Sequence, residues 1–249
     1  MGNVLCFAAF LTTVLLMPFP AQAASFDISP INIVFDAHKA TEKMTVKNTG
    51  EGELSLQLRL YRWTQDGEGK DVYEETKDLV AFPKIMTIKK GEDRLIRIGT
   101  QVKPAAAEKT YRIYLEELPT AAPSQGAATV RFLSRVGVPV FLQPDPVRPR
   151  ARLASLSMRE GRLSIGVRNE GNYHIVIRTI SVRGVDAAGK ALVEQELKGW
   201  YLLNGAERTY TADVPKDRCR SLARVEITVT TDTETLPGQL DVAREMCSP

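Results

Sequence analysis

The feature that most constrains the fold of this 249-residue chain is a two-residue alternation of apolar and polar side chains, which recurs in short segments. It is most regular at residues 53–61, where every second residue is leucine. Turn-forming sequences separate such segments, as at residues 48–52 and 90–93. The chain shows no convincing apolar stripe with the 3.6-residue period of an amphipathic helix. The pattern therefore predicts an all-β protein of the β-sandwich type.

A proline-rich segment at residues 143–150 interrupts this pattern, and a second series of strands is predicted after it. Proline lacks the donor that a sheet ladder needs and stiffens the chain, so we interpret the segment as a linker. The turn at residues 169–171 repeats the Asn-x-Gly sequence of residues 48–50, which suggests related halves. We predict two immunoglobulin-like β-sandwich domains joined by a short Pro-rich linker. Their predicted bounds are residues 24–143 for the N-terminal domain, 144–150 for the linker and 151–249 for the C-terminal domain.

Residues 1–23 predict a secretory signal peptide rather than part of the fold. They contain no charged side chain and hold an apolar run from residue 4 to residue 17. They end in Ala21-Gln22-Ala23, which places small residues at the −3 and −1 positions of a cleavage site after Ala23. No later segment has 18 uninterrupted apolar residues, so we expect an exported chain without a membrane span.

The cysteines and the net charge indicate a disulfide and argue against metal or nucleic-acid binding. Once Cys6 leaves with the signal peptide, Cys219 and Cys247 remain, and a pair in an exported chain predicts a disulfide. Free or reactive thiols are the alternative for this pair. No Cys/His spacing predicts a metal site. The net charge of +3 is spread along the chain, which argues against nucleic acid as a partner.

A catalytic site is not predicted. The two histidines, His38 and His174, are far apart in the sequence, and neither belongs to a known motif. Hydrolase, metalloprotease, phosphate-loop and dinucleotide fingerprints are all missing from the sequence. We therefore assign no catalytic residue, no metal and no cofactor, and predict that the chain is not an enzyme. A hydrolase of unfamiliar design is the alternative.

The most informative segment is residues 128–142, where apolar residues alternate over an unusual length. At about 3.3 Å per residue, a strand of this length exceeds about 40 Å, whereas strands usually have five or six residues. Residues 136–142 fit a central strand of the protein's own core. Residues 130–134 follow a polar loop and extend past any expected neighbour. A long apolar edge strand is an aggregation hazard unless a partner uses it, so we predict β-strand addition to a partner.

Four segments of the first domain carry a combined sequence signature, at residues 26–35, 46–50, 81–98 and 111–119, the last ending in Glu-Leu-Pro. In this combination and order the chain resembles the periplasmic pilus-assembly chaperones of the chaperone–usher pathway. The resemblance implies a periplasmic chaperone that folds pilus subunits and delivers them to an outer-membrane usher.

The resemblance also assigns a role to the long strand. Such chaperones complete a subunit whose incomplete sandwich lacks its last strand. The implied donor positions are Val130, Phe132, Ser134 and Val136. The same edge offers the free protein a route to self-association.

In the resembling family, an arginine of the first strand and a lysine of the long strand hold the subunit's C-terminal carboxylate. Here Asn32 and Pro139 stand at those positions, and neither is charged. The missing pair suggests the archaic branch of the family, where we expect another basic residue to serve. An arginine suits the role because it grips a carboxylate with two hydrogen bonds. The candidates, in order, are Arg112, Arg135 and Arg131, and a solvated strand arginine is the alternative for each.

A second class of function fits the same fold, namely a secreted structural or adhesive protein with two immunoglobulin-like domains and no chaperone activity. It predicts a stable monomer or homopolymer and no co-purifying subunit. Neighbouring genes for an usher and for small Gly-rich subunits would favour the chaperone instead.

Overall fold

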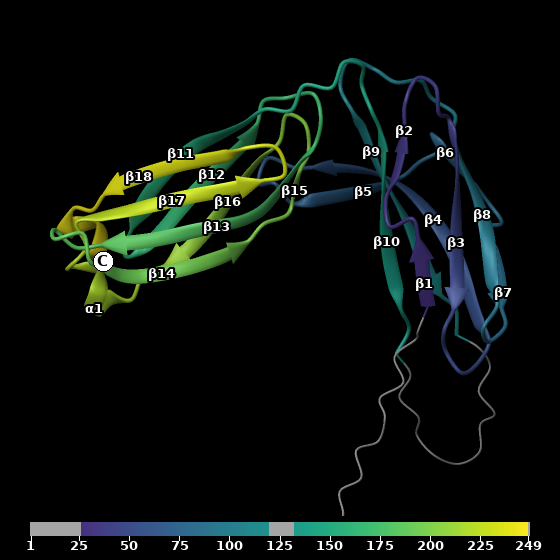
Figure 1. Cartoon of the computed structure of the whole chain (residues 1–249), viewed down its shortest axis with the longest axis horizontal. Coiled ribbons are helices and arrows are strands. Elements are labelled where there is room, and N and C mark those ends of the chain that lie inside the picture. The colour runs from purple at the N-terminus through teal and green to yellow at the C-terminus, as the bar shows by residue number, and fades with distance from the viewer. Residues whose placement is uncertain (1–25, 120–131, 249) are drawn as a thin grey trace, which may run out of the picture.

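The computed structural model describes residues 26–119 and 132–248, which form two β-sandwiches joined at one end (Figure 1). The predicted all-β fold of two immunoglobulin-like sandwiches joined by a short Pro-rich linker is confirmed. Among the described residues only α1 (Lys216–Cys219) and the 3-10 helix η1 (Arg244–Cys247) are helical, and neither is long and apolar enough to cross a membrane. The predicted signal peptide lies outside the described residues and stays a prediction.

The N-terminal sandwich consists of two antiparallel-rich sheets. One sheet has the order β1 (Phe26–Ser29), β3 (Thr41–Asn48), β8 (Asp93–Thr100) and β6 (Leu79–Phe82). The other has the order β2 (Ile33–Phe35), β10 (Arg135–Leu142), β9 (Lys109–Glu117), β4 (Leu54–Gln65) and β5 (Asp71–Glu75), with β7 (Ile85–Ile88) also paired to β4.

The C-terminal sandwich also has two sheets. The smaller has the order β11 (Ala151–Arg159), β12 (Arg162–Asn169) and β16 (Glu207–Asp213). The larger has the order β14 (Ala191–Lys198), β13 (Ile175–Val185), β17 (Arg224–Thr231) and β18 (Thr235–Asp241), with β15 (Tyr201–Leu202) paired to β13. A disulfide joins the buried residues Cys219 and Cys247, whose Cα atoms are 5.7 Å apart, and so ties η1 to α1.

The two-residue alternation places side chains in the core as the pleat of a strand requires. All four leucines of β4 between Leu54 and Leu60 are buried against the facing sheet. Each fully buried leucine contributes about 1.5–3 kcal/mol relative to an exposed one. The alternation in β4 therefore fixes which face of this strand turns inward.

The two Asn-x-Gly turns have the same hydrogen bonds in both sandwiches. The buried Asn48 side chain donates to the carbonyls of Gly52 (2.7 Å) and Ile88 (2.9 Å), and its oxygen accepts the Gly50 N–H (2.9 Å). Asn169 donates to the carbonyls of Tyr173 (2.7 Å) and Leu202 (2.9 Å) and accepts the Gly171 N–H (2.9 Å). In each sandwich one asparagine thus satisfies backbone groups of its own turn and of a distant segment.

We expect Asn48→Ala and Asn169→Ala each to lower the free energy of unfolding by about 2–4 kcal/mol, because each leaves several backbone groups without a partner. Urea denaturation measures this change. The exposed Asn32→Ala serves as the control and should stay within about 0.5 kcal/mol of the parent chain. Equal stability of all three variants would contradict a structural role for the two buried amides.

The long strand begins later than the sequence predicts. Residues 128–131 lie outside the described residues, residues 132–134 form no strand, and β10 starts at Arg135. The reason is the length of the neighbour: β9 ends at Glu117 and is followed by Leu118-Pro119, so the chain before β10 has no described strand to pair with. The expectation of a strand that already includes residues 132–134 is corrected accordingly.

Candidate functional site

Strand β10 has one edge that is only partly covered. The Glu117 N–H donates to the Ser134 carbonyl (2.9 Å), so the antiparallel alternation turns the backbone groups of Arg135, Gly137 and Pro139 away from β9. On that side β2 pairs with β10 only at Val140–Leu142. Within residues 26–119 and 132–248, no strand pairs with this side of residues 135–139, which we call the open edge.

The side chains next to the open edge change from buried to exposed toward its N-terminal end. Val138 and Val140 are buried in the core of the N-terminal sandwich. Val136 is 38% exposed and Phe132 is 79% exposed. The half-buried Ser134 is held to β9 because its N–H also donates to the Glu117 carboxylate (3.1 Å). An exposed aromatic side chain close to backbone groups that no strand pairs with is typical of a protein–protein interaction site.

Of the four predicted donor residues, Val136 lies within the segment of the open edge, and Phe132 and Ser134 lie just before it in the chain. Val130 lies outside the described residues, and so does Arg131 among the predicted anchors. Asn32 is exposed beside β2 and Pro139 is buried in β10. These placements describe where the residues lie, and their roles stay predictions.

The opposite face of the same sheet joins the two domains. Trp63, Phe141 and Leu203 form a buried interdomain cluster, against which Tyr73 and Tyr201 pack. Trp63 and Phe141 come from the N-terminal domain, whereas Leu203 and Tyr201 come from the C-terminal domain. Burial in this cluster raises the pKa of the Tyr73 hydroxyl well above its usual range.

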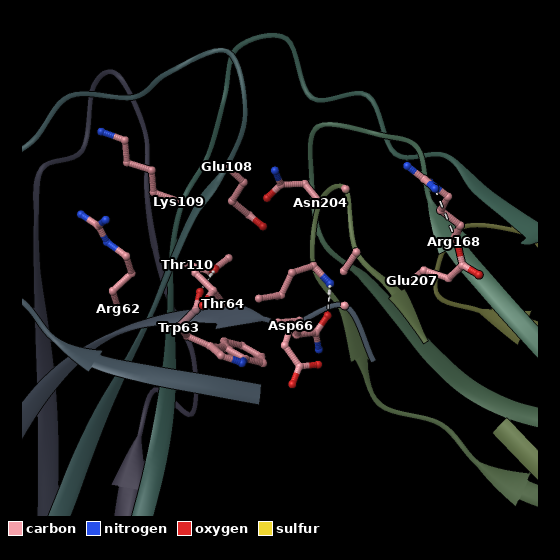
Figure 2. Close-up of a pocket in the computed structure, with 15 residues that line it drawn as sticks. Arg62, Trp63, Thr64, Asp66, Glu108, Lys109, Thr110, Arg168, Asn204 and Glu207 are labelled. Atoms are coloured by element: carbon pink, nitrogen blue, oxygen red, sulfur yellow. Dashed lines mark hydrogen bonds and ion pairs between the residues drawn. The ribbon is translucent and has the colours of Figure 1, made fainter. Parts of the chain in front are cut away.

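Two side chains of the N-terminal domain hold the C-terminal domain by hydrogen bonds. Gln65 donates to the Tyr201 carbonyl (2.9 Å) and accepts the Leu203 N–H (2.9 Å). The buried Glu108 carboxylate accepts the His174 N–H (3.0 Å), and His174 Nδ1 lies 2.8 Å from the same oxygen. Glu108 also lines an interdomain cavity of about 830 Å³. Figure 2 shows the residues around this cavity. The linker thus does not hold the domains together by itself.

Arg112 of β9 lies at the interdomain cluster, and only 7% of it is exposed. Its Cζ atom is 4.2 Å from the centre of the Trp63 ring, a cation–π contact. Its Nη1 atom donates to the Gly137 carbonyl (3.2 Å). Its Nε and Nη2 atoms are buried and have no hydrogen-bond partner among the described residues.

The two unpaired nitrogens of Arg112 lie on the same edge of the planar guanidinium group. A carboxylate binds this edge with two parallel hydrogen bonds, which are among the strong ones because both partners are charged. No carboxylate of the described chain forms an ion pair with Arg112. Arg112 therefore presents a vacant two-donor fork, a term we keep for its Nε and Nη2 atoms.

The β-sheet register explains how Arg112 reaches this position. Arg112 lies directly opposite Pro139 in the β9–β10 ladder, so both side chains project from the same face of the sheet. The arginine then passes over Gly137: a Cβ atom there would lie 3.5 Å from Arg112 Cδ and 2.9 Å from a ring carbon of Tyr114. Glycine at position 137 thus leaves the space that Arg112 and Tyr114 occupy.

Arg135 has a different environment. Its Nε atom is 2.9 Å from the Glu116 carboxylate, and its guanidinium lies 3.9 Å from the centre of the Tyr114 ring. Its charge is therefore already paired. The two histidines have different environments: His38 is exposed in a turn, whereas His174 is paired with Glu108. Within the part of the chain that the structure describes, no group of three or more His, Cys, Asp or Glu side chains is placed to hold a metal ion.

Sequence reasoning missed the partners that surround Arg112. Trp63 and Trp200 are the only tryptophans of the chain, and their rings lie 4.2 and 5.7 Å from the guanidinium carbon. Gln65 and Glu108 were not singled out either, because polar residues near strand ends usually face solvent.

Comparison with known proteins identifies the family. The family model of pili and flagellar-assembly chaperones, PapD N-terminal domain, matches residues 25–148. The chain therefore belongs to the family of pilus-assembly chaperones of the chaperone–usher pathway. No curated protein sequence matches the chain.

Solved structures of chaperones share the two-domain fold. The CsuC–CsuE chaperone–tip subunit complex from archaic Csu pili of Acinetobacter baumannii has a chain that is 20% identical, with a TM-score of 0.61 over 87% of this chain and 98% of that chain. The YadV chaperone is 13% identical, with a TM-score of 0.57 over 87% and 98%. The complex of SafA pilin with the SafB chaperone from Salmonella enterica matches at 13% identity, with a TM-score of 0.53 over 88% and 98%. At these identities the similarity shows the fold.

We expect Glu108→Ala to destabilise the chain by about 3–5 kcal/mol, because it removes one partner of a buried interdomain pair and leaves His174 buried without the other. Urea denaturation measures the loss, and small-angle X-ray scattering should show a broader range of interdomain arrangements. Glu68→Ala removes an exposed ion pair with Lys70 and should cost less than about 1 kcal/mol. Equal stability and equal scattering of the two variants would show that Glu108 does not hold the domains.

Proposed function

We propose that this chain is a periplasmic chaperone that binds pilus subunits by donor-strand complementation and delivers them to an outer-membrane usher. The observation that carries the proposal is the open edge of β10, which has an exposed Phe132 at one end and the vacant fork of Arg112 beside it. Membership of the pilus-assembly chaperone family supports it. The proposed N-terminal domain comprises residues 24–143, with 144–150 as the linker and 151–249 as the second domain.

The hydrophobic part of binding is assigned to Phe132, Val136 and the residue at position 130, with Ser134 between them. A subunit strand that pairs with the open edge would satisfy its free backbone groups, while alternate side chains enter the groove of the incomplete subunit. If three such side chains become buried, the hydrophobic contribution is on the order of 5–8 kcal/mol before ordering costs. Without a subunit, the same edge offers a second copy of the chain a place to pair.

The electrostatic part is assigned to Arg112. A C-terminal carboxylate that enters the interdomain site meets the vacant fork, whose two donors match its two oxygens. Arg112 stands across from Pro139, the position where the family's lysine is expected, so the positive charge lies near the same place although it comes from the neighbouring strand. Arg135 ranks below it because Glu116 already pairs with it, and Arg131 is left as the third candidate.

We expect Phe132→Asp to weaken subunit capture at least about 30-fold, because the substitution removes a buried aromatic ring and places a charge in an apolar groove. Co-expression in the periplasm with the pilus subunit encoded nearest to the chain's own gene, followed by co-purification, measures capture. Phe82→Asp is the matched control, since Phe82 is 77% exposed on the other sheet. If Phe132→Asp still captures the subunit in a one-to-one complex, the donor-strand assignment is wrong. A parent chain that captures nothing would favour the structural or adhesive alternative.

We expect Arg112→Ala to weaken capture at least about 30-fold, because it removes one partner of a buried charge pair. Arg112→Lys keeps the charge but lacks the fork, so it should recover only part of the affinity. The exposed Arg94→Ala on β8 is the control and should bind like the parent chain. The same loss in Arg94→Ala and Arg112→Ala would remove Arg112 from the site. Thermal unfolding of each variant separates loss of binding from loss of fold.

A further inference from the structure

A side chain of the C-terminal domain lies close to the guanidinium of Arg112. The ring centre of Trp200 lies 5.7 Å from Arg112 Cζ, and Trp200 itself is 41% exposed. Both fork nitrogens, by contrast, are buried. A carboxylate that is to bind the fork therefore needs a neighbouring group to move first, and among the aromatic rings around the guanidinium Trp200 is the one with a large exposed surface. Trp63 is fully buried, and Tyr201 is half-buried.

The backbone of Trp200 is fixed, so the movable part is its indole ring. The Trp200 carbonyl accepts the Ile177 N–H (3.0 Å), and the Gly199 N–H donates to the Arg178 carbonyl (3.1 Å). Position 199 approaches β13 so closely that a Cβ atom would lie within 2.6 Å of three atoms of Ile177, two of them in its backbone. A shift of the backbone would break this packing, whereas rotation of an exposed side chain leaves it intact.

One hydrogen bond holds the indole over the guanidinium. Trp200 Nε1 donates to Asp71 Oδ2 (2.8 Å) across the domain boundary. The same carboxylate is already held by the N-terminal domain, because Gln65 donates to its other oxygen (2.9 Å) and Tyr73 donates to Oδ2 (3.2 Å). The bond from Trp200 is exposed to solvent, so water can replace Asp71 when the ring turns away.

We propose that Trp200 is a gate: its indole covers the vacant fork in the free protein and turns aside, releasing Asp71, when the C-terminal carboxylate of a partner binds Arg112. This inference rests on the proposed role of Arg112 as the carboxylate anchor. It gives the C-terminal domain a part in binding, since that domain controls access to a charge that belongs to the N-terminal domain. In the free protein the ring shields a buried cation, and in the complex the carboxylate neutralises it.

Chemical modification of arginine tests the cover without any subunit. Phenylglyoxal reacts with accessible guanidinium groups, and mass spectrometry of peptides gives the rate at each arginine of the folded full chain. We expect Arg112 to react about tenfold faster in Trp200→Ala than in the parent chain, because the reactive open state is then no longer a minor population. Trp200→Phe keeps the ring but loses the bond to Asp71, so it should give an intermediate rate. The rate at the exposed Arg94 should not change. Equal rates at Arg112 in all three proteins would overturn the cover.

The rate of subunit capture shows whether the Trp200 ring controls access to Arg112 or only covers it. With the same pilus subunit as above, a gate predicts that Trp200→Phe and Trp200→Ala capture it at least about threefold faster than the parent chain, since the binding-competent fraction is larger. Slower capture, or an unchanged rate, would overturn the gate even if Arg112 is still required. If the parent chain captures no subunit, the proposed function fails along with the gate, and faster modification of Arg112 would then report only a structural cover.

Discussion

The strand β10 has different neighbours along its length, and the proposed site depends on this difference. Between Val140 and Leu142 it lies between β2 and β9 and is an ordinary core strand. Between residues 135 and 139 only β9 pairs with it among the described residues, so backbone groups without a strand partner face outward, and of these the Gly137 carbonyl accepts a hydrogen bond from Arg112. Such an edge is costly to leave exposed in water unless it is short or used. Here the edge is short, Pro139 removes one of its donors, Arg112 donates to the Gly137 carbonyl, and the proposed function uses the remaining groups.

The proposed anchor Arg112 illustrates how neighbouring strands of a sheet can reach the same site. The strand that would be expected to carry a lysine carries Pro139, which has no charge. Its cross-strand neighbour Arg112 projects from the same face, and Gly137 leaves the space for it to extend across. Cross-strand neighbours are only about 4.5–5.5 Å apart at Cβ, so the Arg112 side chain begins close to position 139. The fork also adds a two-donor geometry that an ammonium group lacks.

The domain interface prepares this region before any partner binds. The Glu108–His174 pair and the two hydrogen bonds of Gln65 hold the sandwiches in one arrangement. That arrangement places Trp200 of one domain near Arg112 of the other. A preformed site loses less conformational freedom on binding, which leaves more of the contact energy for affinity. The second domain therefore contributes to the proposed site although its core is separate.

The sequence by itself determined the fold class, the two-sandwich organisation and the inward face of strands such as β4, because the direction of a strand side chain is a local property with a period of two. It also indicated the equivalence of Asn48 and Asn169. Only the tertiary structure decided that β10 starts at Arg135, because this depends on where β9 ends. It likewise decided that Arg112 lies across from Pro139 and close to Trp200, which is far from it in the chain. Such contacts depend on register and on domain packing, which no local pattern of residues encodes.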